Sequence, residues 1–196
     1  MSSHEDPAFV HLETPRLRLR RFRAGDAVAF AGYRNDPEVA RLQGWDTPYS
    51  TSAALEFVAD LESVSPGRPG TWFQFAVALQ QSDALVGDCG LRTTRTDPRQ
   101  GELGFSFATE HQGRGYASEA VQSVLGYSFG RLGMHRVFSI TDVRNRRAQR
   151  LLERAGFRRE AHFVEGSWFK GEWASEYLYA QLAAEWKSRM IEARRE

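Results

Sequence analysis

The segment with the clearest chemical signal is the glycine-containing stretch at 105–117, FSFATEHQGRGYA. An apolar strand leads into Gly113 and Gly115 there, and an amphipathic helix begins immediately afterwards. The first backbone N–H groups of a helix have no partner within the helix and the helix dipole is positive there, so anions bind at this end. Glycine has no Cβ and lets a ligand approach the backbone closely. The pattern therefore predicts a binding site for a diphosphate.

Two other phosphate-binding motifs fit this loop less well. A Walker loop ends in Gly-Lys-Ser/Thr, which the sequence does not contain. A dinucleotide-binding G-x-G-x-x-G loop would have Ser118 in place of its third glycine, with Asp142 as the ribose-binding acid. That loop belongs on the first strand of a sheet built from strand–helix–strand units, whereas three strands precede it here. A turn that binds no ligand is a further alternative.

Hydrophobic periodicity indicates the elements that position the loop. Before it, the pattern predicts a loose leader at 1–14, helices at 26–34 and 52–63, and strands at 16–22, 71–79, 84–92 and 101–109. After it, the pattern predicts helices at 117–132 and 146–155, strands at 135–142, 157–165 and 173–181, and a C-terminal helix from about 182 to 196. Short turns join the strands before the loop, and a strand–helix–strand unit follows it. We expect one domain over residues 1–196, with a mixed sheet flanked by helices.

Composition narrows the class of protein. Lysine and arginine number 26 against 25 acidic residues, so the chain lacks the basic excess of nucleic-acid-binding proteins. The longest apolar run, Phe75–Leu79, is too short to cross a membrane, and no signal peptide is visible. Cys89 is the single cysteine and lies in a predicted strand, which indicates a core position. His111, His135 and His162 lack metal-ligand spacing. We expect a cytoplasmic monomer or homodimer that binds a small molecule and no metal, nucleic acid or membrane.

Several motifs, in order, carry a resemblance to a known family. Residues 112–117, QGRGYA, match Q/R-x-x-G-x-G/A, the acetyl-CoA pyrophosphate loop of the GNAT N-acetyltransferase superfamily. Asn145 to Phe157 resembles the N-x-x-S/A…E-K-x-G-F segment of that superfamily. ETPRL at 13–17, NDPEV at 35–39 and the closing Tyr177…Glu185-Trp186 resemble its ribosomal-protein branch, which is Rim-type (RimJ/RimL-like). The likeness spans about residues 12 to 187.

The resemblance implies a fold, a reaction and a set of binding residues. The fold would be α/β (α+β), with a mostly antiparallel sheet of six to seven strands and a β-α-β acetyl-CoA-binding core. The reaction would be acetyl transfer from acetyl-CoA to a primary amine in a ternary complex. The backbone of Phe105, Phe107, Ala108 and Thr109 would contact the pantetheine arm, as would Asn145. The pyrophosphate would be held by Gln112, Gly113, Arg114, Gly115, Tyr116, Ala117 and Ser118. Arg150, with Arg144, Arg146 and Arg147, would pair with the 3′-phosphate or simply form a solvated basic face.

The sequence departs from the family pattern where a general acid is expected. Many members carry a tyrosine at the position of Leu152, and several Rim-type enzymes carry a serine at that of Ala148. The proton for the leaving thiolate would then come from water or another group, and a non-catalytic acyl-CoA-binding sensor remains an alternative. Glu102 is the candidate base, acting through water, or else a solvated carboxylate at a strand end. Glu119 is more simply a favourable charge at a helix start.

The acceptor is constrained less strongly. An α-amine, with a pKa of about 7.7–8.0, is deprotonated more readily than a lysine amine of about 10.4, so a weak base favours a peptide or protein N-terminus. An aminoglycoside or polyamine is the alternative, since Glu38, Asp46, Asp60 and Glu62 lie in the predicted substrate-side elements. Trp45 and Tyr49, in the loop at 44–49, would either line the substrate cleft or cover the core.

Overall fold

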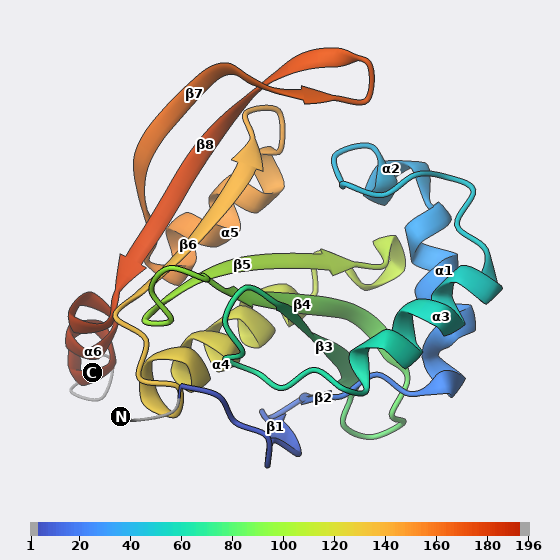
Figure 1. The fold of residues 1–196 in the computed structure, drawn as a ribbon, viewed down its shortest axis with the longest axis horizontal. Coiled ribbons are helices and arrows are strands. Elements are labelled where there is room, and N and C mark those ends of the chain that lie inside the picture. Colours follow the sequence, from blue (N-terminus) through green and yellow to red (C-terminus); the bar gives the residue numbers. More distant parts are fainter. Residues whose placement is uncertain (1–3, 193–196) are drawn as a thin grey trace.

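The computed structural model describes residues 4–192, and its strands form one eight-stranded sheet (Figure 1). The strand order is β1-β2-β3-β4-β5-β6-β8-β7. β5 and β6 pair in parallel, and the other neighbouring strands pair antiparallel. The strands are β1 (His11–Glu13), β2 (Leu17–Arg20), β3 (Trp72–Leu79), β4 (Leu85–Thr93), β5 (Gln100–Phe107), β6 (Arg136–Asp142), β7 (Arg158–Phe169) and β8 (Glu172–Leu182).

Side-chain caps set the beginnings of several helices. Ser50 accepts a hydrogen bond from Ala53 N at the start of α3, and Asp36 accepts one from Glu38 N at the start of α2. The helices are α1 (Ala27–Asn35), α2 (Pro37–Ala40), α3 (Thr51–Leu61), α4 (Tyr116–Gly130), α5 (Arg146–Ala155) and α6 (Ala183–Glu192). Short 3-10 turns lie at Ala24–Asp26 and Thr109–His111. No helix in the described part of the chain is both long and apolar enough to cross a membrane.

The two faces of the sheet are covered differently. One face packs against α4 and α5, in a core that includes Phe75, Cys89 and Leu103 together with Leu125 and Leu152. The opposite face meets α1 and α3 in a second cluster at its β3 end, around Ala76. Cys89 is fully buried, as expected for a core residue, and burial raises the pKa of its thiol. The remainder of the second face is left free of these helices and carries the site described below.

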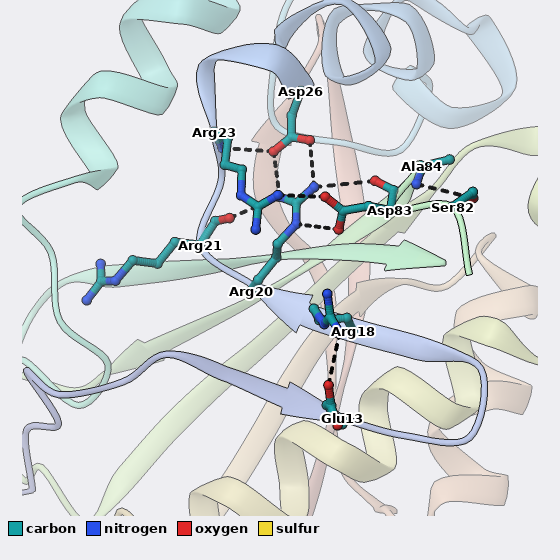
Figure 2. Close-up of polar contacts among 9 residues, drawn as sticks. All are labelled: Glu13, Arg18, Arg20, Arg21, Arg23, Asp26, Ser82, Asp83 and Ala84. Atoms are coloured by element: carbon teal, nitrogen blue, oxygen red, sulfur yellow. Dashed lines mark hydrogen bonds and ion pairs between the residues drawn. The ribbon is translucent and has the colours of Figure 1, made fainter. Parts of the chain in front are cut away.

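The alternating arginines at 16, 18 and 20 are ion-paired, and Arg20 is also buried. Figure 2 shows Arg20 held by Asp26, with Nη1 2.7 Å from Oδ2, and by Asp83, with Nε 3.0 Å from Oδ1. Arg20 is buried, Arg18 pairs with Glu13 and Arg16 pairs with a carboxylate on α4. The alternation correctly predicted the strand, but it gave no indication that the outer face of Arg20 is covered by the turn that leads into α1.

The predicted mixed sheet with flanking helices is confirmed, with two differences. The sheet has eight strands instead of six to seven, because β1 forms within the expected loose leader and pairs with β2. The β7–β8 hairpin is also longer than predicted. Its turn lies at Lys170 and Gly171, which both have positive φ, whereas Gly166 sits at a register shift inside β7. A glycine at a bulge resembles a strand end in sequence alone.

Candidate functional site

The sheet opens between its two parallel strands. β5 and β6 are paired only where Gln100–Glu102 meets Arg136–Phe138. Beyond these residues β5 continues to Phe107 along β4, and β6 continues to Asp142 along β8. In Figure 1 the two strands diverge toward their carboxyl ends. On the side that faces β6, the divergence leaves backbone groups of β5 beyond Glu102 without a strand to pair with.

Hydrogen bonds at both ends of β5 show which groups face the opening. The carbonyl of Gln100 accepts from Thr94 N, and Ala108 N donates to Val86 O, so the even-numbered residues of β5 point toward β4. Because backbone polar groups alternate along a strand, Phe105 and Phe107 direct their N–H and C=O groups into the opening. Gln112 Nε2 donates to the Phe107 carbonyl at 2.9 Å. Of the Phe105–Thr109 backbone expected to contact a ligand, the groups of Phe105 and the N–H of Phe107 face the opening. The carbonyls of Phe107, Ala108 and Thr109 already accept hydrogen bonds, and the Ala108 N–H already donates one.

The glycine loop ends at an uncapped helix. Gly113 and Gly115 have φ values of 75° and 82°, and α4 begins at Tyr116 without a side-chain cap. Within the described residues 4–192, no hydrogen-bond acceptor is found for the backbone N–H groups of residues 113–118. A Cβ at Gly113 would meet nothing within 4 Å, so the loop is open. Unpaired amides at a positive helix end fit the phosphates of a diphosphate.

Contacts from the turn between β1 and β2 hold this loop in place. Glu119 accepts hydrogen bonds from Thr14 Oγ1 at 2.6 Å, from Arg16 N at 2.9 Å and from Arg16 Nε at 2.6 Å. Arg16 also donates to the Arg114 carbonyl at 2.9 Å and lies over the Tyr116 ring. Burial raises the pKa of Glu119, but these hydrogen bonds outweigh it and hold the pKa below its usual range. Glu119 is thus a loop-supporting residue in addition to a charge at the helix start.

The side chains at the start of α5 differ in what they are free to bind. Arg147 donates to Gln112 Oε1 at 2.7 Å, so the predicted pyrophosphate residue Gln112 braces the loop by its side chain. Asn145 Oδ1 caps α5 by accepting from Ala148 N, and within the described chain its Nδ2 has no partner. Arg144 is ion-paired with Asp142 and with a glutamate of β8. Arg150 has no partner among residues 4–192 and is exposed.

A cleft of about 380 Å³ passes through the opening in the sheet. On the α5 side it is bounded by Ser139, Thr141, Asn145 and Ala148, and on the opposite side by Glu102. Its other lining residues are Leu42, Gln43, Gly44, Trp72, Gly104, Phe105, Ile140, Asp142, Phe169, Ala174 and Glu176. The cleft therefore joins the α5 side of the sheet to its free face.

Comparison with known proteins identifies the family. Residues 16–158 match the acetyltransferase (GNAT) domain family. The chain belongs to the GNAT acetyltransferases. It is 36% identical over 159 residues to a spermidine N(1)-acetyltransferase of Vibrio cholerae, covering 81% of this chain and 88% of the relative. It is 24% identical over 185 residues to the [ribosomal protein uS5]-alanine N-acetyltransferase of Escherichia coli, covering 90% and 93%.

A solved relative shares the fold. The crystal structure of spermidine N-acetyltransferase from Vibrio cholerae, in complex with CoA and spermine, superposes with a TM-score of 0.75 at 25% identity, covering 89% of this chain and 99% of that one. The GNAT fold and the enzyme class predicted from the motifs are confirmed. The Rim-type branch remains a prediction, because the spermidine enzyme is the more similar of the two curated relatives.

Glu102 lines the cleft of this acetyltransferase, but one of its carboxylate oxygens is engaged. Oε2 is ion-paired with Arg92 Nη2 from the neighbouring strand β4. Ala148 borders the cleft, whereas Leu152 is fully buried in the core with α4 and β4. At the two positions where the family pattern has a hydroxyl-bearing general acid, this chain therefore has a methyl group that lines the cleft, at Ala148, and a core side chain, at Leu152. Ser139 and Thr141 supply the side-chain hydroxyl groups of the described cleft lining.

Trp45 and Tyr49 are not among the described residues that line the cleft. Both rings pack around the buried guanidinium of Arg34, at 4.3 Å and 4.8 Å from ring centroid to Cζ. Trp45 Nε1 donates to the Arg34 carbonyl, and Tyr49 contacts Phe30 edge-on. Of the two expectations for these residues, the contacts match a cover over the second core cluster. A role in substrate binding stays a prediction.

Sequence reasoning missed several cleft residues, including Trp72, Phe169 and Glu176. Trp72 starts β3, and its place in the cleft depends on the glycines beside it. Glu176 lies opposite Asp142 in the register of β8 with β6, which no local pattern reveals. Ser139 and Thr141 had a signal, since they interrupt the apolar strand RVFSITD at alternate positions.

Proposed function

We propose that this chain transfers the acetyl group of acetyl-CoA directly to a primary amine while both are bound. The observation that carries the proposal is the cleft, which connects Phe105 in the unpaired part of β5 and Asn145 at the start of α5 with a carboxylate-bearing face of the sheet. Attack through such an opening needs no acyl-enzyme. Cys89, the single cysteine, is fully buried and its raised thiol pKa disfavours a nucleophilic thiolate.

The donor side fits acetyl-CoA, which supplies an acetyl group activated as a thioester. The free amides of residues 113–118 would hold the pyrophosphate, with Gln112 bracing them. The backbone of Phe105 to Thr109 and Asn145 Nδ2 would hold the pantetheine arm, and Arg150 would meet the 3′-phosphate. An unpaired N–H in the opening would polarise the thioester carbonyl, where excluded water makes such hydrogen bonds strong.

The acceptor side carries the proposed base. Glu102 would take the proton from the attacking amine through Oε1, directly or through water, because Arg92 engages Oε2. Three carboxylates line the cleft, at Glu102, Asp142 and Glu176, and no lysine or arginine is among its described lining residues. Glu102 and Asp142 are ion-paired with Arg92 and Arg144, whereas Glu176 has no ion-pair partner among residues 4–192. The unneutralised charge of Glu176 attracts a cation.

The first candidate acceptor is therefore a small cationic amine of the polyamine kind. The carboxylates of the cleft support it, as does the 36% identity to a spermidine acetyltransferase. The second candidate is the α-amine of a peptide or protein. The low basicity of that amine supports it, together with the weaker match to a ribosomal-protein alanine acetyltransferase.

Three wider expectations accompany this function. We infer one domain over residues 1–196, acting in the cytoplasm as a monomer or homodimer. The single sheet that runs from β1 to β7 across the described residues supports the first. The unremarkable charge balance and the absence of a spanning helix among the described residues are compatible with the second.

Release of CoA thiol from acetyl-CoA tests the function directly. Purified protein is incubated with acetyl-CoA and, separately, with spermidine, an aminoglycoside, and peptides with free or blocked N-termini. Release with spermidine selects the first candidate, and release with free but not blocked peptides selects the second. Binding of acetyl-CoA without release by any amine would contradict the proposal and support the acyl-CoA-binding sensor.

A further inference from the structure

A chain of buried polar side chains lies on the same face of the sheet as Glu102, outside the machinery described above. Tyr33 Oη of α1 donates to Asp88 Oδ1 at 2.5 Å, and Gln74 Nε2 of β3 donates to Asp88 Oδ2 at 3.0 Å. Asp88 and Tyr33 are buried. Gln74 Oε1 is also buried, and no donor reaches it among residues 4–192. The hydrogen bond from Nε2 to Asp88 therefore fixes the Gln74 amide on one side, while its Oε1 is buried without a hydrogen bond among the described residues.

Two glycines form the floor beneath Gln74 and Trp72. Gly90 of β4 lies opposite Gln74 in register, and Gly104 of β5 lies opposite Gly90. A Cβ at Gly90 would come 2.1 Å from Gln74 Oε1 and 3.0 Å from Trp72 Cε3. A Cβ at Gly104 would come 3.8 Å from the Trp72 ring. The amide and the indole therefore occupy the space that a side chain at Gly90 would fill, and both rest on the backbone.

The indole seated on this floor is a wall of the cleft. Trp72 and Gly104 both line it, next to Glu102. Trp72 is 38% exposed and pairs with Arg92 of β4, and β2 does not extend along β3 as far as this residue. Arg92, which pairs with Glu102, lies over the Trp72 ring at 5.4 Å from its centroid. The orientation of the indole thus bears on the space for an acceptor and on the guanidinium that holds the base.

We propose that Gln74, held by Asp88 and Tyr33, is a positioning residue that fixes the indole of Trp72 on the Gly90–Gly104 floor, where the indole packs against the chain of the acceptor. The inference rests on the proposed function and adds to it a specificity for one class of acceptor amine. The cleft that Trp72 lines also includes the apolar side chains of Ile140 and Phe169 and the carboxylates of Glu102 and Glu176. The acceptor that fits is an amine on an unbranched aliphatic chain with a second positive charge, because methylenes pack on the rings and ammonium groups face carboxylates.

Steady-state kinetics with an aliphatic diamine test the specificity. Gln74→Ala and Trp72→Leu are each expected to raise the KM for the diamine about tenfold, the size of a lost aromatic contact. The KM for acetyl-CoA is expected to stay within about twofold, since the glycine loop lies elsewhere. The double variant is expected to be no worse than Trp72→Leu alone, because Gln74 acts through Trp72. Gln81→Ala and Trp168→Leu are matched controls, since Gln81 and Trp168 are exposed and neither lines the cleft.

Conservative replacement separates positioning from charge. In Asp88→Asn, Oδ1 can still accept from Tyr33, and the new amide can donate to Gln74 Oε1 once that side chain turns over. This variant is expected to retain the diamine KM, whereas Asp88→Ala is expected to behave like Gln74→Ala. If Asp88→Asn raised the KM as much as Asp88→Ala, the carboxylate charge and not its hydrogen bonds would matter, and the positioning role would be overturned.

A measurement independent of turnover completes the test. In protein labelled with fluorotryptophan, the fluorine resonance that disappears in Trp72→Phe reports the indole environment. It is expected to move in Gln74→Ala and Asp88→Ala and to stay in place in Asp88→Asn and Gln81→Ala. An unmoved resonance in Gln74→Ala would overturn the positioning role whatever the acceptor is. A moved resonance with an unchanged diamine KM would overturn the specificity while leaving acetyl transfer intact, and failure of wild-type protein to acetylate any amine would instead defeat the proposed function.

Discussion

Glu102 reaches the cleft with one carboxylate oxygen engaged by Arg92 and the other available to an amine. At the residue scale, the proposed reaction depends on this second oxygen accepting a proton. Leu152 and Ala148 carry no group that could replace it, and the cysteine is buried on the other face. The sequence offered Glu102 as a candidate base, and that role stays a prediction. The Arg92 pair follows from the cross-strand register of β4 and β5, which only the structure supplies.

Glu102→Gln is expected to lower kcat for amine acetylation about a hundredfold, because a neutral amide cannot act as a general base. Affinity for acetyl-CoA should be unchanged, since the glycine loop does not contact this residue. Turnover by thiol release and binding by calorimetry give the two values. Glu62→Gln, at an exposed position after α3, is the control. Full activity in Glu102→Gln would remove this residue from the mechanism.

Asp88 should make stability depend on pH in a defined direction. Burial raises the pKa of Asp88 to about 6, against the opposing hydrogen bond from Tyr33. Between about pH 4 and pH 7 the unfolded chain gives up this proton before the folded chain does, so this group lowers stability as pH rises. The stability of Asp88→Asn relative to wild type should therefore increase by up to about 3 kcal/mol as the pH rises through this window. Urea unfolding at a series of pH values measures the difference. A constant difference would show that Asp88 has an ordinary pKa.

At the element scale, the junction of β5 with α4 is the feature that the sequence revealed best. Glycines at positive φ, a helix start and an apolar strand are local patterns, so residues 105–117 could be interpreted without tertiary information. No local pattern predicts the divergence of β5 from β6, because it depends on which strands pair and for how far. The full β7–β8 hairpin was missed since a glycine inside a bulge and a glycine in a turn look alike.

Gly115→Val is expected to abolish acetyl-CoA binding. A valine at φ 82° is strained by about 1–3 kcal/mol and its Cβ would lie 3.1 Å from Arg16 Nη2, so the loop amides would be displaced. Gly133→Val is the matched control, because Gly133 also has positive φ but lies beyond the far end of α4. Calorimetric titration distinguishes them. Retained affinity in Gly115→Val, or equal loss in Gly133→Val, would contradict the loop assignment.

At the scale of the whole molecule, buried ion pairs tie the edge of the sheet to the helices that cover the acceptor face. Arg20 of β2 joins Asp26, before α1, to Asp83, in the turn between β3 and β4 (Figure 2). Hydrophobic patterning predicted the strands and helices that meet here. It could not predict the pairing, since Asp83 lies 63 residues from Arg20 in sequence. The covered face near α1 in turn limits the cleft to the other end of the sheet.

Asp26→Ala is expected to lower the free energy of unfolding by about 3 kcal/mol, because it leaves the buried Arg20 guanidinium with Asp83 alone. Asp97→Ala, which breaks a surface pair with Arg99, should cost clearly less, because solvent screens exposed ion pairs. Urea unfolding measures both. Equal losses in the two variants would show that the Arg20 pair is no more important than a surface pair.

The most direct test of the proposed donor site is a titration of acetyl-CoA into isotopically labelled protein, followed by the backbone amide resonances. The largest shifts are expected at residues 113–118, with smaller ones at Phe105 and Phe107, and Gly115→Val should remove them. Saturating acetyl-CoA that left the amides of residues 113–118 in place would contradict the phosphate-binding loop, and with it the acetyl transfer that depends on it.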